Sequence, residues 1–479
     1  MSPSPDADEQ ALTRLTLLHS QHMPAPRAVI IGGGFGGLSA AFELVRRGID
    51  VTVLEADGEV GGLAGSFEVN GQRLEKFYHH WFTNDIHVGG LVRELGEGHN
   101  IIYRPSRTGM YFANRIFRLS SPSDVLRFTP LPLADRVRLG LLALRARAVK
   151  DWRALEHETA QEWLVRLGGE RVYEVVWQPL LEGKFGPFAS DISAVWIWNK
   201  LKLRGSSRAR SGAELLAYYR GGFAALAERL ACAVRTGGGD IRVSTAATAL
   251  VVDDGRVVAV ETENGTVDAD AVIATPALPI VADLVAPHAP DDWVRRLRAI
   301  EYLANVCIVL ELDRSLSDTY WLNVNDPGFP FVAVIEHTNL EPASTYGGRH
   351  IVYLSKYLPA SAELYRMSDE AALEYSLPHL VRMFPAFDRR WITAAHVWRA
   401  RYAQPIVSKH YTQLVPPAET PLEGLYLSSM AQIYPEDRGT NYAVRDGSRI
   451  GRRVASHLIA NTNGSGRRSD YGVGPHAAR

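Results

Sequence analysis

Two glycine clusters, separated by the length of one helix and one strand, constrain the fold of this chain more than any other feature of its sequence. The first cluster follows the apolar run Ala28–Ile31, which lacks polar alternation and is therefore typical of a buried parallel strand. Gly32, Gly34 and Gly37 have the spacing G-x-G-x-x-G and lead into a run of good helix formers. A second predicted strand, "IDVTVLEAD", carries Glu55 at its end. This order predicts a dinucleotide-binding unit of the Rossmann type.

The residue types of this unit suit the chemistry of a dinucleotide. The first glycine makes a tight turn, the second admits a pyrophosphate close to the backbone, and the third lets helix and strand pack closely. The helix N-terminus offers free N–H groups and the positive end of its dipole to the phosphates, and a carboxylate after the second strand accepts hydrogen bonds from a ribose. The expected contacts with the dinucleotide are Gly32, Gly34, Phe35, Gly36, Gly37, Glu55 and Ala56.

The second cluster, "GEVGGLAGSF", follows Glu55 and indicates which dinucleotide is bound. With Gly61 and Gly62 in this register, the sequence resembles the flavoprotein superfamily of amine oxidases, protoporphyrinogen oxidases and phytoene desaturases. The resemblance implies FAD, with Gly61, Gly62 and Leu63 passing close to its pyrophosphate and ribityl chain. Many members have arginine where this chain has Leu63, so backbone N–H groups or another residue must neutralise the phosphate charge.

The resemblance extends over residues 27 to about 460 and implies a domain organisation. We predict an α/β fold, in which a Rossmann-like FAD-binding domain has an inserted helical subdomain and an α+β substrate domain built on an antiparallel or mixed sheet. Turns at Asp253–Gly255 and Glu263–Gly265 predict a β-meander. The expected divisions are a disordered extension at 1–23, FAD-binding segments at 24–105, 205–285 and 419–461, a helical cap at 106–204, a substrate-domain sheet at 286–418 and a disordered tail at 462–479.

The resemblance also implies cofactor contacts far from the N-terminal unit. In the family a backbone contact to adenine comes from the position of Ala247, and a final helix points its N-terminus at the pyrimidine end of the flavin. Ser429 and Met430 stand where the family usually has an acid, which leaves their ribityl contacts open. The residues expected at the polar edge of the flavin are Asn441, Tyr442 and Ala443.

Three stretches are expected to line the reactive face of the flavin: "EKFYHHWF", "PLLEGKFGPFASDIS" and "VWRARYAQPIVSKHY". Histidines there can polarise a substrate or accept a proton, although paired histidines in an aromatic run are equally typical of packing. The lysine of the second stretch either lies near flavin N5 or caps a helix, and the tyrosines of the third also suit an ordinary strand. The residues predicted to converge on the ring are His79, His80, Lys184, Tyr402 and Gln404.

Composition excludes several classes of partner and site. Lysine and arginine (52) balance aspartate and glutamate (53), so no overall field attracts nucleic acid or an anionic membrane. Two cysteines, Cys232 and Cys307, are too few for a disulfide framework or a zinc cluster, and this favours a cytoplasmic protein. Neither cysteine lies in a segment expected near the flavin, so we expect FAD to be bound without a covalent link. No apolar run reaches the roughly 20 residues of a transmembrane helix, and the first residues do not resemble a secretory signal.

One segment leaves two interpretations open. The stretch "DRVRLGLLALRARAVKDWR" interleaves leucines with basic side chains. We expect a solvated helix with its leucines in the core. The alternative is peripheral contact with a membrane, as for some relatives that handle lipophilic isoprenoids. The basic residues are Arg136, Arg138, Arg145, Arg147, Lys150 and Arg153.

These features predict an FAD-dependent oxidoreductase that removes a hydride from a small organic or natural-product substrate onto flavin N5. The oxidised bond is that of an amine, an alcohol or a carbon–carbon pair. No second G-x-G-x-x-G follows a strand, so the reduced flavin is expected to be reoxidised by oxygen or another acceptor and not by a separate NAD(P)H domain. Two alternatives stay open: a redox-neutral, flavin-dependent sugar mutase and a non-catalytic FAD-binding protein.

Overall fold

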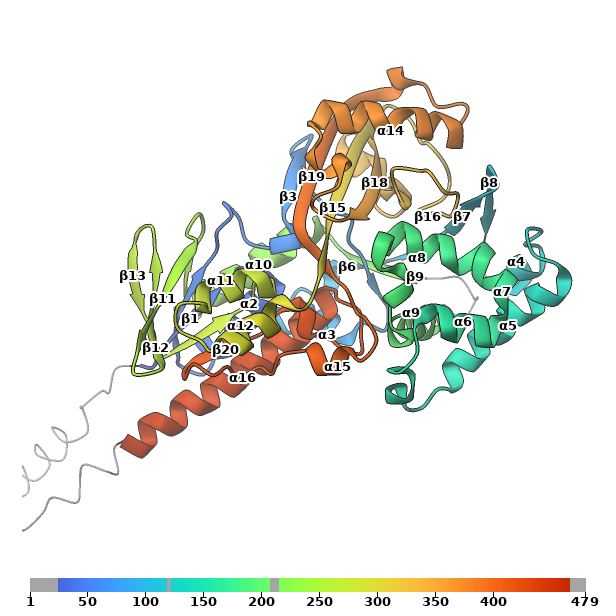
Figure 1. Ribbon diagram of the computed structural model, residues 1–479. Coiled ribbons are helices and arrows are strands. Elements are labelled where there is room, and N and C mark those ends of the chain that lie inside the picture. The colour runs from blue at the N-terminus through green and yellow to red at the C-terminus, as the bar shows by residue number, and fades with distance from the viewer. Residues whose placement is uncertain (1–24, 119–121, 207–214, 466–479) are drawn as a thin grey trace, which may run out of the picture.

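The computed structural model describes residues 25–118, 122–206 and 215–465, which form a parallel-sheet part, a helical block and a second, mixed sheet (Figure 1). The expected N-terminal extension lies outside these residues. So does the expected tail, except that residues 462–465 continue the last helix.

A five-stranded parallel sheet, in the order β10-β2-β1-β14-β20, forms the centre of the first part. Ala28 and Ile30 of β1 face one core and Val29 and Ile31 face another, which explains why this run shows no polar alternation. The strands are β1 (Arg27–Ile31), β2 (Asp50–Leu54), β10 (Asp240–Arg242), β14 (Ala271–Ala274) and β20 (Leu425–Leu427).

Helices cover one face of this sheet, and two of them touch backbone to backbone. The helices are α2 (Phe35–Val45), α10 (Gly222–Thr236) and α16 (Thr440–Ser465). A Cβ at Gly447 would lie 2.1 Å from the carbonyl oxygen of Gly36, and one at Gly451 would lie 2.6 Å from that of Ala40. Only glycine permits this approach, which brings the N-terminal ends of α2 and α16 next to each other.

The opposite face is covered by the predicted β-meander, whose existence and turns are confirmed. Its strands pair antiparallel, and Asp254, Gly255 and Gly265 at the turns have φ values of 43°, 76° and 118°. Two helices follow it. These elements are β11 (Ala247–Asp253), β12 (Arg256–Thr262), β13 (Gly265–Asp268), α11 (Leu278–Val285) and α12 (Asp291–Arg298).

The helical block begins later than the sequence pattern suggested. Residues 108–118 form a hairpin that joins the seven-stranded sheet, and the helices start at residue 122. Trp163, Phe185 and Trp196 fill the interior of the block. Its helices are α4 (Pro122–Leu126), α5 (Leu133–Ala148), α6 (Ala160–Gly168), α7 (Glu170–Val172), α8 (Gln178–Phe185) and α9 (Ala194–Ser206).

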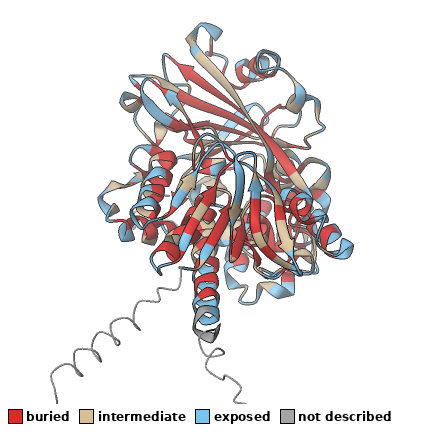
Figure 2. Ribbon diagram, turned by 90° about the vertical axis from the view of Figure 1, so that its left-hand side faces the viewer, coloured by how far each residue is buried: buried red, intermediate tan, exposed pale blue. Residues whose placement is uncertain are grey.

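The third part is a mixed sheet in the order β19-β15-β18-β17-β16-β7-β8, in which β16 and β7 are parallel. Helix α14 (Asp369–Met383) covers one face of this sheet, where Ile308 and Leu310 pack. Cys307 and Val309 lie on the other face, which packs against the parallel-sheet part. Buried residues accordingly run along both kinds of sheet (Figure 2). The strands are β7 (Thr108–Phe112), β8 (Arg115–Arg118), β15 (Tyr302–Leu312), β16 (Trp321–Val324), β17 (Ala333–Glu336), β18 (His350–Leu358) and β19 (Ile392–Pro405).

Short elements connect these parts. They are β3 (Ser66–Val69), β4 (Gln72–Glu75), β5 (Trp81–Phe82), α3 (Ile86–Glu94), β6 (Ile101–Pro105), β9 (Leu215–Tyr219), α13 (Glu363–Arg366) and α15 (Tyr411–Leu414). Within the described ranges, no helix combines the length and the apolar character needed to cross a bilayer.

Candidate cofactor and substrate site

The first glycine cluster forms a turn from β1 into α2 that side chains would block. A Cβ at Gly32 would lie 2.4 Å from Thr275 Oγ1, and one at Gly37 would lie 2.0 Å from the carbonyl oxygen of Gly32. Gly34 is the N-cap of α2, and no side chain of the described residues caps this helix. The first N–H groups of α2 therefore have no capping oxygen, which suits them to an anionic group.

The second glycine cluster packs directly on the first. Gly61 donates its N–H to the carbonyl of Gly33 at 3.0 Å and forms a β-bridge with Gly34. A Cβ at Gly62 would lie 3.3 Å from the Cα of Gly34. The two clusters, far apart in sequence, therefore make one backbone-lined surface, and Leu63 continues it as a partly buried residue.

Glu55 links the end of β2 to this surface. Its carboxylate is buried and accepts N–H groups of Gly33 at 2.6 Å and Asp57 at 2.9 Å. Burial raises the pKa of Glu55, against the opposing effect of these hydrogen bonds. Ala56, next to it, is exposed. Thr245 donates its N–H to the Glu55 carbonyl at 2.8 Å, which places Ala247, two residues later, near the same edge.

The C-terminal candidates lie around the start of α16. The Ala443 carbonyl lies 3.7 Å from the position of a Cβ on Gly36, so it adjoins the first glycine cluster, and Tyr442 beside it is partly buried. The Asn441 side chain has a structural role, because its Oδ1 accepts N–H groups of His87 at 2.9 Å and Val88 at 3.1 Å at the start of α3. The backbone of Asn441 and its Nδ2 donor are then left for a cofactor.

Ser429 and Met430 occupy the loop between β20 and α16. Ser429 is buried and donates its N–H to Gln432 Oε1 at 2.8 Å, and Met430 begins a short 3-10 turn that ends at Gln432. Where the family usually has an acidic residue, this chain therefore has a turn whose backbone is held by the side-chain amide of Gln432.

The aromatic stretch after β4 is held in place by Glu75. The buried Glu75 carboxylate accepts the N–H of Phe223, at the start of α10, at 2.6 Å and the hydroxyl of Tyr218 at 2.8 Å. Tyr353 of β18 donates its hydroxyl to the Glu75 carbonyl at 2.8 Å. These bonds join three parts of the chain and fix the direction in which residues 76–80 leave the strand.

The two predicted histidines point to different surroundings. His79 Nδ1 lies 2.6 Å from the Phe77 carbonyl and its ring packs on Phe223, which itself packs on Phe35. Burial, together with the nearby Arg438, lowers the pKa of His79 to about 4. The imidazole is therefore neutral at physiological pH.

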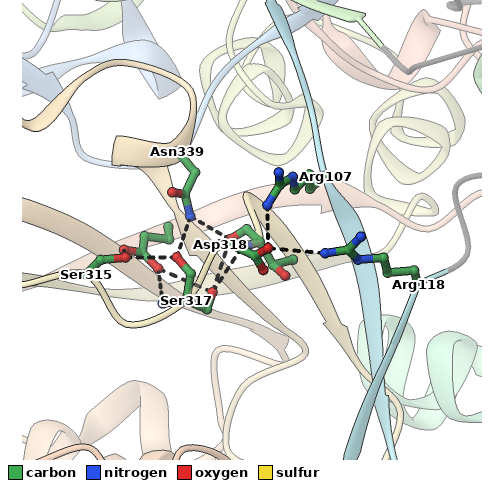
Figure 3. A network of polar contacts seen from close by, with 8 residues as sticks. Arg107, Arg118, Ser315, Ser317, Asp318 and Asn339 are labelled. Carbon is green, nitrogen blue, oxygen red and sulfur yellow. Dashed lines mark hydrogen bonds and ion pairs between the residues drawn. The ribbon is translucent and has the colours of Figure 1, made fainter. Parts of the chain in front are cut away.

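His80 instead faces the seven-stranded sheet, where its Nδ1 lies 2.9 Å from the Tyr320 hydroxyl. A polar network holds the loop before Tyr320 in place (Figure 3). In it, Asp318 pairs with Arg107 and with Arg118, and Asn339 donates to backbone carbonyls of the same loop. The network fixes the position of Tyr320 and, through it, the orientation of His80.

Lys184 lies in a group of charges that the sequence pattern did not reveal as a whole, here called the cationic cluster: Lys184, Lys200, Asp437 and Arg438. The Lys184 ammonium lies 4.9 Å from the ring centre of Trp196 and 5.2 Å from that of Tyr357. Arg438 donates to the Tyr357 hydroxyl at 2.8 Å. Two cations from distant segments therefore meet at Tyr357 of β18.

Asp437 is the carboxylate at the centre of the cationic cluster. It accepts the indole N–H of Trp196 at 3.1 Å and pairs with Lys200 at 2.5 Å. Although burial opposes it, the charges of Lys200, Lys184 and Arg438 hold the pKa of Asp437 well below its usual range. The cluster therefore has three cations for one ionised carboxylate, and its net charge is positive.

Buried polar atoms without hydrogen-bond partners lie on the adjoining face of the sheet. Within the described residues, they include Gln404 Oε1, Asn305 Oδ1 and Trp398 Nε1. Asn305 lies directly between Tyr357 of β18 and Ala400 of β19, so this face continues from the cationic cluster. Such buried polar atoms can form hydrogen bonds with a ligand that lies against this face.

Tyr402 and Cys307 complete this face. The Tyr402 ring lies beside the Tyr302 ring, with their centres 5.6 Å apart. In the sequence Tyr402 comes two positions before the buried Gln404. Cys307 pairs with Trp398 across the strands and is buried, contrary to the expectation that both cysteines lie away from the site. Burial raises the pKa of the Cys307 thiol far above its usual range, so it stays protonated and unreactive.

The residues present therefore fit an FAD: two glycine clusters that expose backbone, a buried acid, two adjacent helix N-termini and a sheet face with unpartnered polar atoms. Lys184 and Arg438 meet at Tyr357, and the charge of Arg438 acts on His79, whereas His80 lies toward Tyr320. The sequence reasoning missed Arg438, although a cation directly before a helix N-terminus, where the dipole disfavours it, was a usable signal. It also missed Lys76, whose ammonium lies 5.1 Å from the ring centre of Trp398.

Comparisons with known proteins agree with this geometry. A family model described as flavin containing amine oxidoreductase matches residues 35–455. The chain is 25% identical over 189 residues to protoporphyrinogen oxidase 2 of Arabidopsis thaliana, which covers 38% of this chain and 37% of the relative. It is 25% identical over 319 residues to phytoene dehydrogenase of Streptomyces griseus, which covers 56% of this chain and 58% of the relative.

These matches span less than two thirds of either relative. The fold itself resembles that of cyclohexylamine oxidase from Brevibacterium oxydans IH-35A, with a TM-score of 0.67 at 17% identity over 91% of this chain and all of that one. The predicted fold class is confirmed.

Proposed function

Because this chain belongs to the family of flavin containing amine oxidoreductases, and is therefore an enzyme with FAD as its cofactor, we propose that it removes a hydride from a small organic substrate. The bond oxidised is that of an amine, an alcohol or a carbon–carbon pair. The observation that carries the proposal is the meeting of Lys184 and Arg438 at Tyr357, next to the sheet face with unpartnered polar atoms, with Arg438 near enough to His79 for its charge to lower the pKa of that imidazole. FAD, when bound, supplies the hydride acceptor at its N5 atom.

The protein's contribution to this reaction is electrostatic. Lys184 and Arg438 make the site positive, which favours negative charge developing on the substrate or on the reduced cofactor. The rings of Trp196 and Tyr357 shield the Lys184 ammonium from part of the solvent, which strengthens its interaction with a nearby negative charge.

His79 offers a hydrogen-bond acceptor. With its Nδ1–H donated to the Phe77 carbonyl, the free Nε2 lone pair can accept a hydrogen bond from a substrate O–H or N–H. Its lowered pKa, about 4, makes it a weak base, which suits orientation of the substrate better than full removal of a proton. Gln404 supplies a second acceptor, Oε1, from β19.

A cytoplasmic location is part of the proposal. Neither Cys232 nor Cys307 forms a disulfide, which supports a reducing compartment.

The test is anaerobic reduction of the bound flavin by a panel of amines, alcohols, sugars and polyenes. At least one class should bleach the flavin absorbance, and Lys184→Met should slow bleaching at saturating substrate far more than it weakens FAD binding. Lys150→Met, at an exposed lysine of the helical block, is the matched control and should behave as wild type. Product formation without net flavin reduction would favour the mutase alternative, and a flavin that no compound reaches would favour a non-catalytic protein.

A further inference from the structure

A cavity of about 780 Å³ opens where the helical block meets α12, α15 and the loop before α16. Its lining residues come from these four segments, and none of them is among the residues predicted to contact FAD or substrate. Small-molecule sites typically have volumes of about 300–1,000 Å³ and lie at boundaries between parts of a fold. The size and the place of this cavity therefore suit a small ligand.

Hydrogen bonds hold the walls of the cavity together. The carbonyl of Glu156, in the helical block, accepts the N–H of His410 at 3.0 Å, and its carboxylate accepts the Thr412 hydroxyl at 2.6 Å. On the opposite wall, Arg296 of α12 donates to the carbonyl of Val415 at 3.0 Å. The cavity is therefore formed before any ligand enters it, as is usual for small-molecule sites.

One side of the cavity is aromatic and apolar. The rings of Trp152 and Tyr434 meet edge to face, with their centres 5.1 Å apart. Val415, Pro416 and Pro417 line the cavity together with these rings. Aromatic and proline rings are rigid, flat surfaces, against which the ring of a ligand can pack without ordering long side chains.

The polar side of the cavity is positively charged. Arg153 and Arg296 both line it, and the guanidinium of Arg153 lies 4.9 Å from the ring centre of Trp152. Arg153 pairs with Asp151 at 3.6 Å, which is too long for a hydrogen bond. The acid among the described lining residues is Glu156, whose carboxylate is already hydrogen-bonded. Two guanidinium groups are thus available to a ligand with a negative charge.

We propose that this cavity is a second small-molecule site, and that its ligand is an aromatic anion. The ring of the ligand packs against Trp152 and the two prolines, and its anionic group pairs with Arg153 and Arg296. An inorganic anion would leave the aromatic side of the cavity without a partner. A neutral aromatic molecule would leave the two guanidinium groups without one.

The proposed ligand should bind together with FAD and not in its place. Gln432 lines the cavity, and its Oε1 accepts the N–H of Ser429 at 2.8 Å. Ser429 does not line the cavity and belongs to the predicted cofactor contacts. The short turn of residues 429–432 therefore joins the two sites while each keeps its own lining residues.

The test is isothermal titration calorimetry of the full-length, FAD-loaded protein with three probes. They are 2-naphthoate, which has a ring and a charge, 2-naphthamide, which has the ring alone, and acetate, which has the charge alone. We expect 2-naphthoate to bind to one saturable site. The other two probes should bind at least about tenfold more weakly, because each lacks one half of the recognition.

Variants locate the site. Arg153→Gln and Trp152→Ala should each lower the affinity for 2-naphthoate at least about tenfold. Arg295→Gln is the matched control, because Arg295 is an exposed neighbour of Arg296 that does not line the cavity, and it should bind as wild type. Unchanged flavin content and melting temperature would show that each variant is folded.

Three results would overturn the proposal. The first is that 2-naphthoate shows no saturable binding, or binds no better than the neutral amide. The second is that Arg153→Gln binds it as tightly as Arg295→Gln does. The third is release of flavin during the titration, because the probe would then occupy the cofactor site. None of these results depends on the substrate or on turnover.

Discussion

Replacing Glu55 by glutamine removes one charge from the point where β2 meets the two glycine clusters. The carboxylate accepts two backbone N–H groups, of Gly33 at 2.6 Å and of Asp57 at 2.9 Å. A glutamine has one oxygen, so its amide nitrogen must face one of these donors. A ribose hydroxyl that donates to Glu55 would also lose its charged acceptor, and because a hydrogen bond to a charged group contributes roughly 1.5 to 3 kcal/mol, FAD binding should weaken by about 10- to 150-fold.

The assay is titration of the apoprotein with FAD, followed by flavin fluorescence. Asp57→Asn is the control, because it removes the same charge from an exposed side chain two residues away. Burial raises the pKa of Glu55 above 4.5, so protonation should already weaken FAD binding of wild type as the pH falls toward that raised pKa, and Glu55→Gln should lack this dependence. An affinity of Glu55→Gln within about twofold of the Asp57→Asn value would refute the role given to this carboxylate.

Three further outcomes are expected. Denaturation should release all FAD into solution, because the Cys307 thiol is buried and protonated; flavin that stays with precipitated protein would contradict this. Gly447→Ala should lower the stability by about 1–3 kcal/mol in thermal unfolding, since its Cβ would lie 2.1 Å from the Gly36 carbonyl, whereas Gly90→Ala, with open space, should not. The rate of flavin reduction should show no ionisation from His79 above about pH 5.5, because its pKa is about 4; an ionisation near neutral pH that disappears in His79→Asn would disprove this.

The FAD-binding unit could be predicted because its signals are local. The spacing of Gly32, Gly34 and Gly37 and the position of Glu55 each follow from one turn or one strand, and the structure shows why these glycines cannot carry side chains. The resemblance implies that Gly61 and Gly62 pass close to the same pyrophosphate, and in the structure Gly61 packs on Gly33 and Gly34.

The cationic cluster could not be predicted in the same way. Lys184, Lys200 and Arg438 come from α8, α9 and the loop before α16, and no periodicity links their positions. The hairpin β7–β8 lies within the range predicted to be helical, and its partner strand β16 follows more than two hundred residues later, as the pairing of Thr108 with Trp321 shows, so only the tertiary fold brings them together.

Helix α5 shows a different limit. Its leucines recur with helical spacing, which predicts a helix but does not tell which of two apolar stripes is buried. Leu142 is buried and Leu144 is exposed, and that choice is made by the helices packed against α5, such as α9.

The most direct test of the whole account is an experimentally determined structure with FAD bound. We predict that its pyrophosphate lies against Gly32–Gly37 and Gly61–Gly62, and that the reactive face of its ring lies within contact distance of His79 and of the face formed by Tyr357 and Gln404. A flavin ring turned away from Lys184 and His79 would contradict the proposed site, even if the glycine clusters held the phosphates as expected.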